Sequence, residues 1–550
     1  MRFWRFYLVL VFFSLLGAAI LSRLVFLQIK KHDYYQAMSE GQQKILKEES
    51  GKRGEIFFRS GEPAVINKTG SYVFLCPNEI KEKEKVADVL SSILNLDKKW
   101  LLEKAKKDNL FEVVKRRLSL EEENKIKEAN MEGVHCEKET FRYYPHQELA
   151  AHALGFLSAD GQGQYGVEGF YNEILKGKEI LAERERGPFG FFKSSAEKTT
   201  GKNLVLTLDS SLQLKAEKLL SDNEKNLKFE SGQILVMDPN SGEIMAMAEW
   251  PSFNPNLYNE IESPEIFKNA LLQKIFEPGS VFKPITMSAA INEGKISPET
   301  TYIDAGLVKI GGSTIYNYGQ KVFGEQTMTG VLEKSINTGA VFAEKKLGHE
   351  LFLEYLDKFG FFEKTGVDLQ GEVFSENLEF KKGYEVNFAT ASFGQGIEIT
   401  PIQIAVAFSA LANGGKLVKP HILKQAEGIS LDLREKEIIS KETSYQIVTM
   451  LSSVIENGFG KAAKVNGYYL AGKTGTAQVS WPALNIQKRG YSEKTVQTFV
   501  GFGPAFNPKF LILIKLDNPQ TKTAEYSAAP IFKELAKYII DYWQIVPDYE

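Results

Sequence analysis

The fold is decided by two apolar runs, GQILVMD at residues 232–238 and EIMAMA at residues 243–248. The intervening residues 239–242, PNSG, are typical of a tight turn, so the two runs predict a β-hairpin. Three more strand-like runs occupy residues 468–478, 497–503 and 510–516, and a helix with apolar residues at helical spacing follows Pro530. Strands from both ends of this region, with a mostly helical middle, predict one sheet closed by the two chain halves and covered by helices.

Upstream of this body, residues 30–200 are rich in lysine and glutamate. Residues 81–109 and 118–130 predict amphipathic helices with solvated faces, and residues 149–157 predict a short apolar element before the glycine turn at 161–164. The polar stretch 193–202 is typical of a linker. We therefore expect a first body at 30–200 and a second body at 204–545.

The amino terminus carries the one long apolar segment of the chain. Residues 6–22 are uncharged, and after Arg23 residues 24–29 are again mostly apolar. A segment of this length at 6–29 predicts a transmembrane helix, with Arg23 reaching the interface. Arg2 and Arg5 predict that a tail at 1–5 stays in the cytoplasm and that the body lies outside it. A cleaved signal peptide, with Gly17–Ala19 as its cleavage site, is the alternative, but the renewed apolar run disfavours it.

Composition excludes several classes of protein. The chain has 550 residues, 43% hydrophobic and 25% charged, which indicates several globular domains and not bulk disorder. Its net charge of −3 provides no basic excess, so we expect no nucleic-acid partner. Two cysteines, Cys76 and Cys136, are too few for a disulfide framework, and the sequence leaves open whether they pair.

Six scattered histidines show neither metal-ligand spacing nor a Gly-x-Ser-x-Gly elbow. A nucleophile would therefore need a base other than histidine. Ser-x-x-Lys supplies one, because residues three apart share a helix face and a neutral lysine can accept the serine proton. The motif occurs at Ser195–Lys198, in the polar linker, and at Ser280–Lys283, which opens an apolar helix. The second context favours Ser280 as nucleophile and Lys283 as base.

Two further motifs each occur several times, and their order along the chain and local context select one match of each. Ser-x-Asn occurs at four places, and only Ser335–Asn337 opens an apolar segment downstream of Ser280. Lys-Thr-Gly occurs three times, and only Lys473–Gly475 lies within a predicted strand. A strand edge with Gly475 favours close approach of a substrate backbone, and Lys473 with Thr474 and Thr476 can hold a carboxylate.

This ordered set resembles the active site of penicillin-binding proteins and class A β-lactamases. The flanking segments resemble class B penicillin-binding proteins in particular, and the resemblance covers nearly the whole chain. The segments are FEPG at 276–279, ASFGQG at 391–396, TPIQ at 400–403, FVGF at 499–502, RLVFLQ at 23–28, RGEI at 53–56 and GVEG at 166–169. One position departs from the family pattern: Phe58 stands where an aspartate usually precedes the arginine.

The resemblance implies an α/β (α+β) architecture with a transpeptidase domain built on a mainly antiparallel sheet flanked by helices. An elongated pedestal domain and one membrane helix would precede it. It also implies a peptidoglycan D,D-transpeptidase that needs no cofactor or metal. Ser280 would attack the penultimate D-Ala of a stem peptide, and β-lactams would acylate it as substrate mimics.

The resemblance assigns a role to each of the other residues. Lys283 would be the base, Ser335 would pass a proton to the leaving amine, and Asn337 would hold Lys283 and the substrate amide. Lys473 would assist Ser335. The remaining residues are expected at the substrate carboxylate or the oxyanion hole: Thr474, Gly475 and Thr476.

The pathway depends on a finer pattern. Residues 335–339, SINTG, resemble division-type members, whereas elongation-type members often carry aspartate at the third position. The resemblance therefore implies septal cell-wall synthesis, with a multi-span glycan polymerase and other division proteins as partners. The alternatives are an elongation-type enzyme and a non-catalytic β-lactam sensor or scaffold. A sensor would need several membrane spans, and a scaffold would have lost part of the motif set. A small β-lactamase would leave 30–200 without a purpose, and a bifunctional polymerase would need a second catalytic signature.

Overall fold

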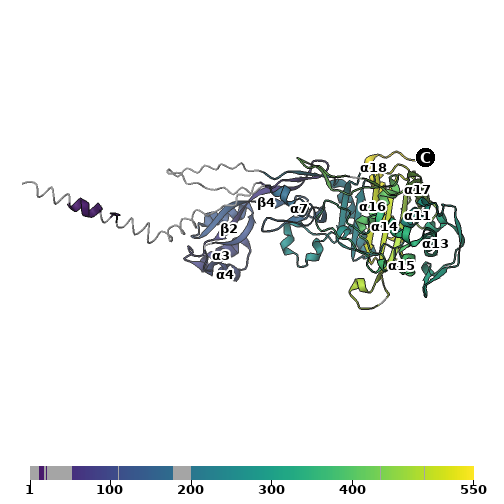
Figure 1. Ribbon diagram of the computed structural model, residues 1–550. Helices are drawn as coiled ribbons and strands as arrows, with labels where there is room; N and C mark the ends of the chain where they lie inside the picture. The colour runs from purple at the N-terminus through teal and green to yellow at the C-terminus, as the bar shows by residue number, and fades with distance from the viewer. Residues whose placement is uncertain are drawn as a thin grey trace, which may run out of the picture. The chain divides into compact units, whose positions relative to one another are not determined.

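The computed structural model describes residues 11–17, 20–21, 52–109, 111–177, 200–433, 435–488 and 490–550 (Figure 1). Within these ranges, no helix combines the length and the apolar character that crossing a membrane requires. The predicted cytoplasmic tail 1–5 and most of the predicted membrane helix 6–29 lie outside the described residues, as does most of the predicted linker. The elements below belong to one compact unit, Gly54–Leu175 with Lys202–Glu550.

A five-stranded antiparallel sheet with the order β17-β18-β19-β8-β9 forms the centre of the second body. Its strands are β8 (Ser231–Met237), β9 (Ile244–Trp250), β17 (Ala471–Ser480), β18 (Tyr491–Gly503) and β19 (Phe510–Asp517). The hairpin at 232–248 thus pairs with strands from the far end of the chain. The two chain halves close one sheet, as the apolar runs predicted.

Both faces of this sheet are buried, which explains why its strands are apolar runs and not alternating ones. Ile234 and Val236 of β8 face one cluster, together with α9 (Ser210–Leu227) and α18 (Ala528–Trp543). Leu235 and Met237 face the larger cluster, with α11 (Lys283–Asn292), α16 (Pro401–Ala412) and α17 (Lys441–Glu456). The period of two along a strand therefore divides its side chains between two helical layers.

A second, six-stranded sheet carries the first body. Its order is β15-β7-β1-β2-β3, with β4 also paired to β2. The strands are β1 (Ile56–Phe57), β2 (Pro63–Leu75), β3 (Glu112–Leu118), β4 (Val134–Tyr143), β7 (Leu204–Leu206) and β15 (Leu423–Ala426). Because β7 and β15 come from the second body, this sheet joins the two bodies through backbone hydrogen bonds.

Three helices cover the lysine- and glutamate-rich end of that sheet: α3 (Lys83–Leu94), α4 (Lys98–Lys106) and α5 (Leu120–Ala129). We call Pro63–Tyr143 the β2–β4 lobe. Its small core includes Val73, Leu90 and Leu101. The expected helix at 118–130 is shorter, because β3 extends to Leu118 and Ser119 caps α5 with a capping box to Glu122.

The remaining elements are short or complete the helical layers. They are α6 (Ala151–Leu154), β5 (Phe156–Leu157), β6 (Gly163–Gln164), α7 (Gly166–Phe170), α8 (Asn172–Lys176), α10 (Ala270–Gln273), β10 (Thr301–Asp304), β11 (Leu307–Ile310), β12 (Ser313–Tyr316), β13 (Gly324–Thr327), α12 (Met328–Glu333), α13 (Asn337–Leu347), α14 (His349–Lys358), α15 (Glu385–Ala391), β14 (Lys416–Leu417) and β16 (Lys436–Glu437).

The unusual Phe58 is accounted for by its surroundings. Its side chain is fully buried in the large core, and its ring lies 5.8 Å from that of His146 in an edge-on arrangement. Arg59 next to it forms an ion pair with Glu243 of the second body. An aspartate at position 58 would bury an unpaired charge here, so the phenylalanine fits this core.

Candidate active site

Ser280 lies on a tight turn that leads into a buried helix. The turn is the 3₁₀ helix η4 (Gly279–Phe282), and α11 continues it from Lys283. Gly279 has a φ of +60° and its N–H donates to the Gly394 carbonyl at 2.9 Å. A Cβ on Gly394 would approach the Gly279 oxygen to 2.2 Å. The ASFGQG segment therefore packs directly under the serine, which explains why glycine is needed at both positions.

Lys283 contacts both serines of the predicted set. Its Nζ lies 3.0 Å from Ser280 Oγ and 3.2 Å from Ser335 Oγ, and it donates to the Ser335 carbonyl at 2.6 Å. The side chain is fully buried. Burial, followed by the charge of Lys473, holds the pKa of Lys283 well below its usual value. The amine next to Ser280 is thus suited to accept a proton near neutral pH.

Ser335 connects the two lysines. It sits between α12 and α13 with a φ of +53°, a conformation that a non-glycine residue rarely adopts. Lys473 of β17 donates from Nζ to Ser335 Oγ at 3.0 Å and to the Thr474 carbonyl at 3.0 Å. Burial lowers the pKa of Lys473 to about 7. The hydroxyl of Ser335 therefore bridges two amines that both lose charge easily.

Gly475 has a role that its sequence context did not indicate. The residue is buried, and a Cβ there would lie 2.9 Å from Val281 Cγ1 and 3.0 Å from the Pro278 carbonyl. Its lack of a side chain lets β17 pack against the turn that carries Ser280. Since β17 is an edge strand of the central sheet, its outer edge runs beside η4 and not beside another strand.

The other predicted residues are placed less directly. Asn337 Nδ2 donates to the Tyr316 carbonyl at 3.0 Å, and the described contacts include no bond from Asn337 to Lys283. Lys283 Nζ donates instead to the Ser335 carbonyl. Thr474 Oγ1 lies 3.4 Å from Lys473 Nζ, and Thr476 Oγ1 accepts from the Ala524 N–H at 3.1 Å. Ser195, the other Ser-x-x-Lys serine, lies outside the described residues.

Sequence reasoning missed the support of the Ser335 loop. The buried Asp304 accepts from Thr338 Oγ1 at 2.6 Å and from Asn317 Nδ2 at 2.9 Å. Burial alone would raise the pKa of Asp304, but these hydrogen bonds and two from backbone N–H groups lower it. The carboxylate therefore fixes the start of α13 next to Ser335. No local motif marks it, because the aspartate and Thr338 lie 34 residues apart.

Comparison with known proteins agrees with this geometry. Residues 232–537 match the penicillin binding protein transpeptidase domain, and residues 48–206 match the penicillin-binding protein dimerisation domain. Stage V sporulation protein D of Bacillus subtilis is 33% identical over 85% of this chain and 74% of its own length. Peptidoglycan D,D-transpeptidase FtsI of Escherichia coli K12 is 28% identical over 99% of this chain and 93% of its length. Penicillin binding protein 3 of Mycobacterium tuberculosis superposes with a TM-score of 0.69 at 25% identity, covering 90% of this chain and 97% of that one.

The site consists of two buried lysines around two serines, and the transpeptidase domain matches more than half of the chain. Together these features define a serine acyl-transfer enzyme. The chain belongs to the penicillin-binding protein transpeptidase family. Together with the dimerisation domain, this makes it a class B penicillin-binding protein, a peptidoglycan D,D-transpeptidase of the serine type.

Proposed function

We propose that Ser280 is the nucleophile that forms the acyl-enzyme and that the cross-link is made in septal cell-wall synthesis. The observation that supports the first part is the 3.0 Å contact between Ser280 Oγ and a fully buried Lys283 amine whose pKa is lowered. A buried amine without a carboxylate partner is costly, so a chemical role accounts for its retention.

In the acylation step, the Ser280 hydroxyl gives its proton to neutral Lys283 while Oγ bonds to the penultimate D-Ala carbonyl. The oxyanion that forms accepts from the backbone N–H groups of Ser280 and Thr476. As the C–N bond breaks, Ser335 protonates the leaving D-Ala amine and takes a proton back from Lys283, which becomes neutral again. An amine from a second stem peptide then attacks the acyl carbon and gives a proton to Lys283; the bond to Ser280 Oγ breaks, and Lys283 returns that proton to Oγ, which restores the hydroxyl and completes the cross-link.

We propose that the substrate lies along the outer edge of β17, next to the Ser280 turn. An extended peptide there can hydrogen-bond to backbone groups of the strand. Thr474 and Thr476, beside the Lys473 ammonium, would then bind the terminal carboxylate, and β-lactams would occupy the same place. Asn337 would donate to the substrate amide in exchange for its bond to the Tyr316 carbonyl.

The septal assignment rests on the SINTG pattern at 335–339 and on the resemblance that it supports. We also propose a cytoplasmic tail at 1–5, a membrane helix at 6–29, a pedestal at 30–200 and a transpeptidase domain at 204–545. In this arrangement the enzyme works on the extracytoplasmic side, next to a multi-span glycan polymerase.

The septal assignment is tested in cells. Depletion of the protein should give undivided filaments, and a tagged copy should gather at mid-cell. Round, widened cells with dispersed protein would assign the enzyme to elongation.

The nucleophile is tested by labelling membranes with a fluorescent penicillin. Ser280→Ala should abolish the labelled band, whereas Ser195→Ala, at the other Ser-x-x-Lys match, should label like the parent. Mass spectrometry should find the adduct on the peptide that contains Ser280. An adduct on Ser335, or labelling of Ser280→Ala, would overturn the assignment.

A further inference from the structure

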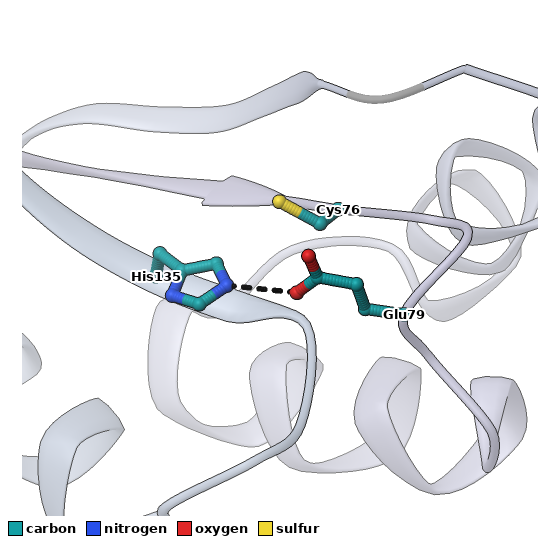
Figure 2. Close-up of side chains that lie close together, drawn as sticks. All are labelled: Cys76, Glu79 and His135. Atoms are coloured by element: carbon teal, nitrogen blue, oxygen red, sulfur yellow. Dashed lines mark hydrogen bonds and ion pairs between the residues drawn. The ribbon is translucent and has the colours of Figure 1, made fainter. Parts of the chain in front are cut away.

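The β2–β4 lobe contains a cluster of three side chains that the transpeptidase reaction does not use. They are Cys76, Glu79 and His135, shown in Figure 2. The thiol, a carboxylate oxygen and an imidazole nitrogen all lie within 4.8 Å of one another, and His135 Nε2 lies 3.2 Å from Glu79 Oε2. In the part of the chain that the structure describes, no other three histidine, cysteine or acidic residues are grouped in this way.

The backbone holds the three residues in place. Cys76 directly follows β2, and its N–H donates to the Gly133 carbonyl at 2.8 Å. The Glu79 N–H donates to the Cys76 carbonyl at 2.9 Å, which closes the turn between them. His135 lies in β4 opposite Phe74 in the strand register, and its ring packs on the Phe74 ring at 5.4 Å. The cluster thus joins the end of β2 to the start of β4.

We propose that Cys76, Glu79 and His135 bind a zinc ion, with water as the fourth ligand. Zinc takes sulfur, nitrogen and oxygen ligands at about 2.0–2.3 Å, so tetrahedral ligand atoms are about 3.3–3.8 Å apart. The three ligand atoms, which lie within 4.8 Å of one another, must move closer together to reach this spacing; the Glu79 and His135 side chains are 58% and 47% exposed and have room to rotate. Calcium and magnesium prefer all-oxygen sites, which excludes them here.

The second cysteine is not part of the site. Cys136 pairs with Val73 across the strands, and Val73 lies three residues before Cys76. At about 3.3 Å per residue, the Cα atoms of the two cysteines are therefore about 10 Å apart. This distance exceeds the limit of about 7 Å for a disulfide, and both cysteines are free in the structure. Cys136 packs against the core of the lobe and therefore provides a matched control.

The test uses the full chain in detergent, stripped with a chelator and titrated with zinc chloride by calorimetry. We expect one zinc per chain. Replacing a residue that only hydrogen-bonds to a zinc ligand costs about 10–100-fold in zinc affinity. Replacing a ligand itself, as in Cys76→Ser or His135→Gln, should therefore cost about 100-fold or more. Cys136→Ser should bind like the parent. Zinc should raise the melting temperature of the parent and of Cys136→Ser. It should not raise that of Cys76→Ser or His135→Gln.

Cobalt provides a spectroscopic readout of the thiolate ligand itself. The parent loaded with Co²⁺ should show a thiolate-to-metal charge-transfer band, and so should Cys136→Ser. Fluorescent penicillin should label all the variants equally, because the transpeptidase site is untouched. Absence of the band in the parent, its loss in Cys136→Ser, or unchanged zinc affinity in Cys76→Ser would each overturn the proposal.

Discussion

The transpeptidase site and the β2–β4 lobe use lysine in opposite ways. Lys283 and Lys473 are fully buried, contact no carboxylate among the described residues, and have lowered pKa values. In the lobe, lysines stay near solvent and pair with glutamates, as Lys104 and Lys107 do with Glu112. The first arrangement costs stability and yields a base; the second yields solubility and a modest gain in stability.

Replacing Lys283 with arginine should abolish acylation. Arginine keeps the positive charge but does not deprotonate at accessible pH, so it cannot accept the Ser280 proton. General-base catalysis contributes about 10²–10⁴-fold, and a nucleophile and its base act as a unit, so we expect a loss of at least about 10⁴-fold. The rate of penicillin acylation by stopped flow measures it.

The matched control is Lys127→Arg on the lobe surface, where the lysine pairs with Glu123. It should acylate at the parental rate. An active Lys283→Arg enzyme would show that the buried lysine acts only through its charge, and the contrast between the two regions would then fail.

Replacing Lys473 with methionine should shift the pH profile as well as lower the rate. The Lys473 charge contributes to the low pKa of Lys283, so its removal should raise that pKa. Acylation requires neutral Lys283 and is lost as pH falls through its pKa; the acid limb of the profile should therefore move to higher pH. We expect a loss of about 10²-fold near neutrality, with partial recovery at alkaline pH. A uniform loss at every pH would mean that the two amines are not coupled.

The residues that the structure brings together, Ser280, Lys283, Ser335 and Lys473, could be selected from the sequence because their motifs are local; their catalytic roles stay predictions. Ser280–Lys283 lies within one helical turn and Lys473–Gly475 within one strand, so period and spacing were sufficient. The order of the motifs then selected Ser335 from four candidates. The apolar runs at 232–248 and 510–516 likewise indicated a sheet closed by both chain halves, because strands buried on both faces are continuous in sequence.

Long-range contacts were not predictable in this way. Asp304 supports the Ser335 loop from 34 residues away without a motif. The joining of the two bodies through β7 and β15 depends on short strands with weak patterns. Gly475 was interpreted as clearance for a substrate backbone, which stays a prediction; its contact with Val281, which the structure adds, had no signal in the sequence. The β2–β4 cluster escaped detection because Cys76 and His135 meet only through the register of β2 and β4.

Gly475→Ala therefore tests packing at the site without changing its charges. The added Cβ would meet Val281 and the Pro278 carbonyl, and the backbone oxygen cannot give way cheaply. Overpacking of this kind costs about 1–3 kcal/mol, and acylation should fall with it because the Ser280 turn moves. Gly330→Ala in α12 is the control, since there the new Cβ meets side-chain atoms and no backbone, with the Gln326 amide oxygen at 3.0 Å and Thr327 Oγ1 at 3.5 Å. Thermal unfolding compares the two; equal stability would show that β17 does not constrain the turn.

The smallest effects concern two glutamates whose pKa values shift in opposite directions. Glu217 of α9 packs on the transpeptidase side and accepts from the Ala150 N–H at 2.8 Å. Burial raises its pKa to about 7. Its protonated form is favoured in the folded state, so its contribution is complete below pH 4.5 and is lost as pH rises through about 7. In the lobe, hydrogen bonds from Lys107 and then Lys104 lower the pKa of Glu112 to about 2.

The contribution of Glu112 therefore has the opposite pH dependence: it is present above pH 4.5 and is lost as pH falls through about 2. In denaturant unfolding from pH 4 to 8, the parent should lose stability as pH rises through about 7, and Glu217→Gln should not show this loss. Glu112→Gln should lower stability by about 1 kcal/mol throughout that range, since solvent screens pairs near the surface. Because each variant leaves the other carboxylate intact, the two effects should add in the double variant. If both glutamates gave the same slope, burial would not distinguish the two regions, and the low pKa values of Lys283 and Lys473 would need another cause.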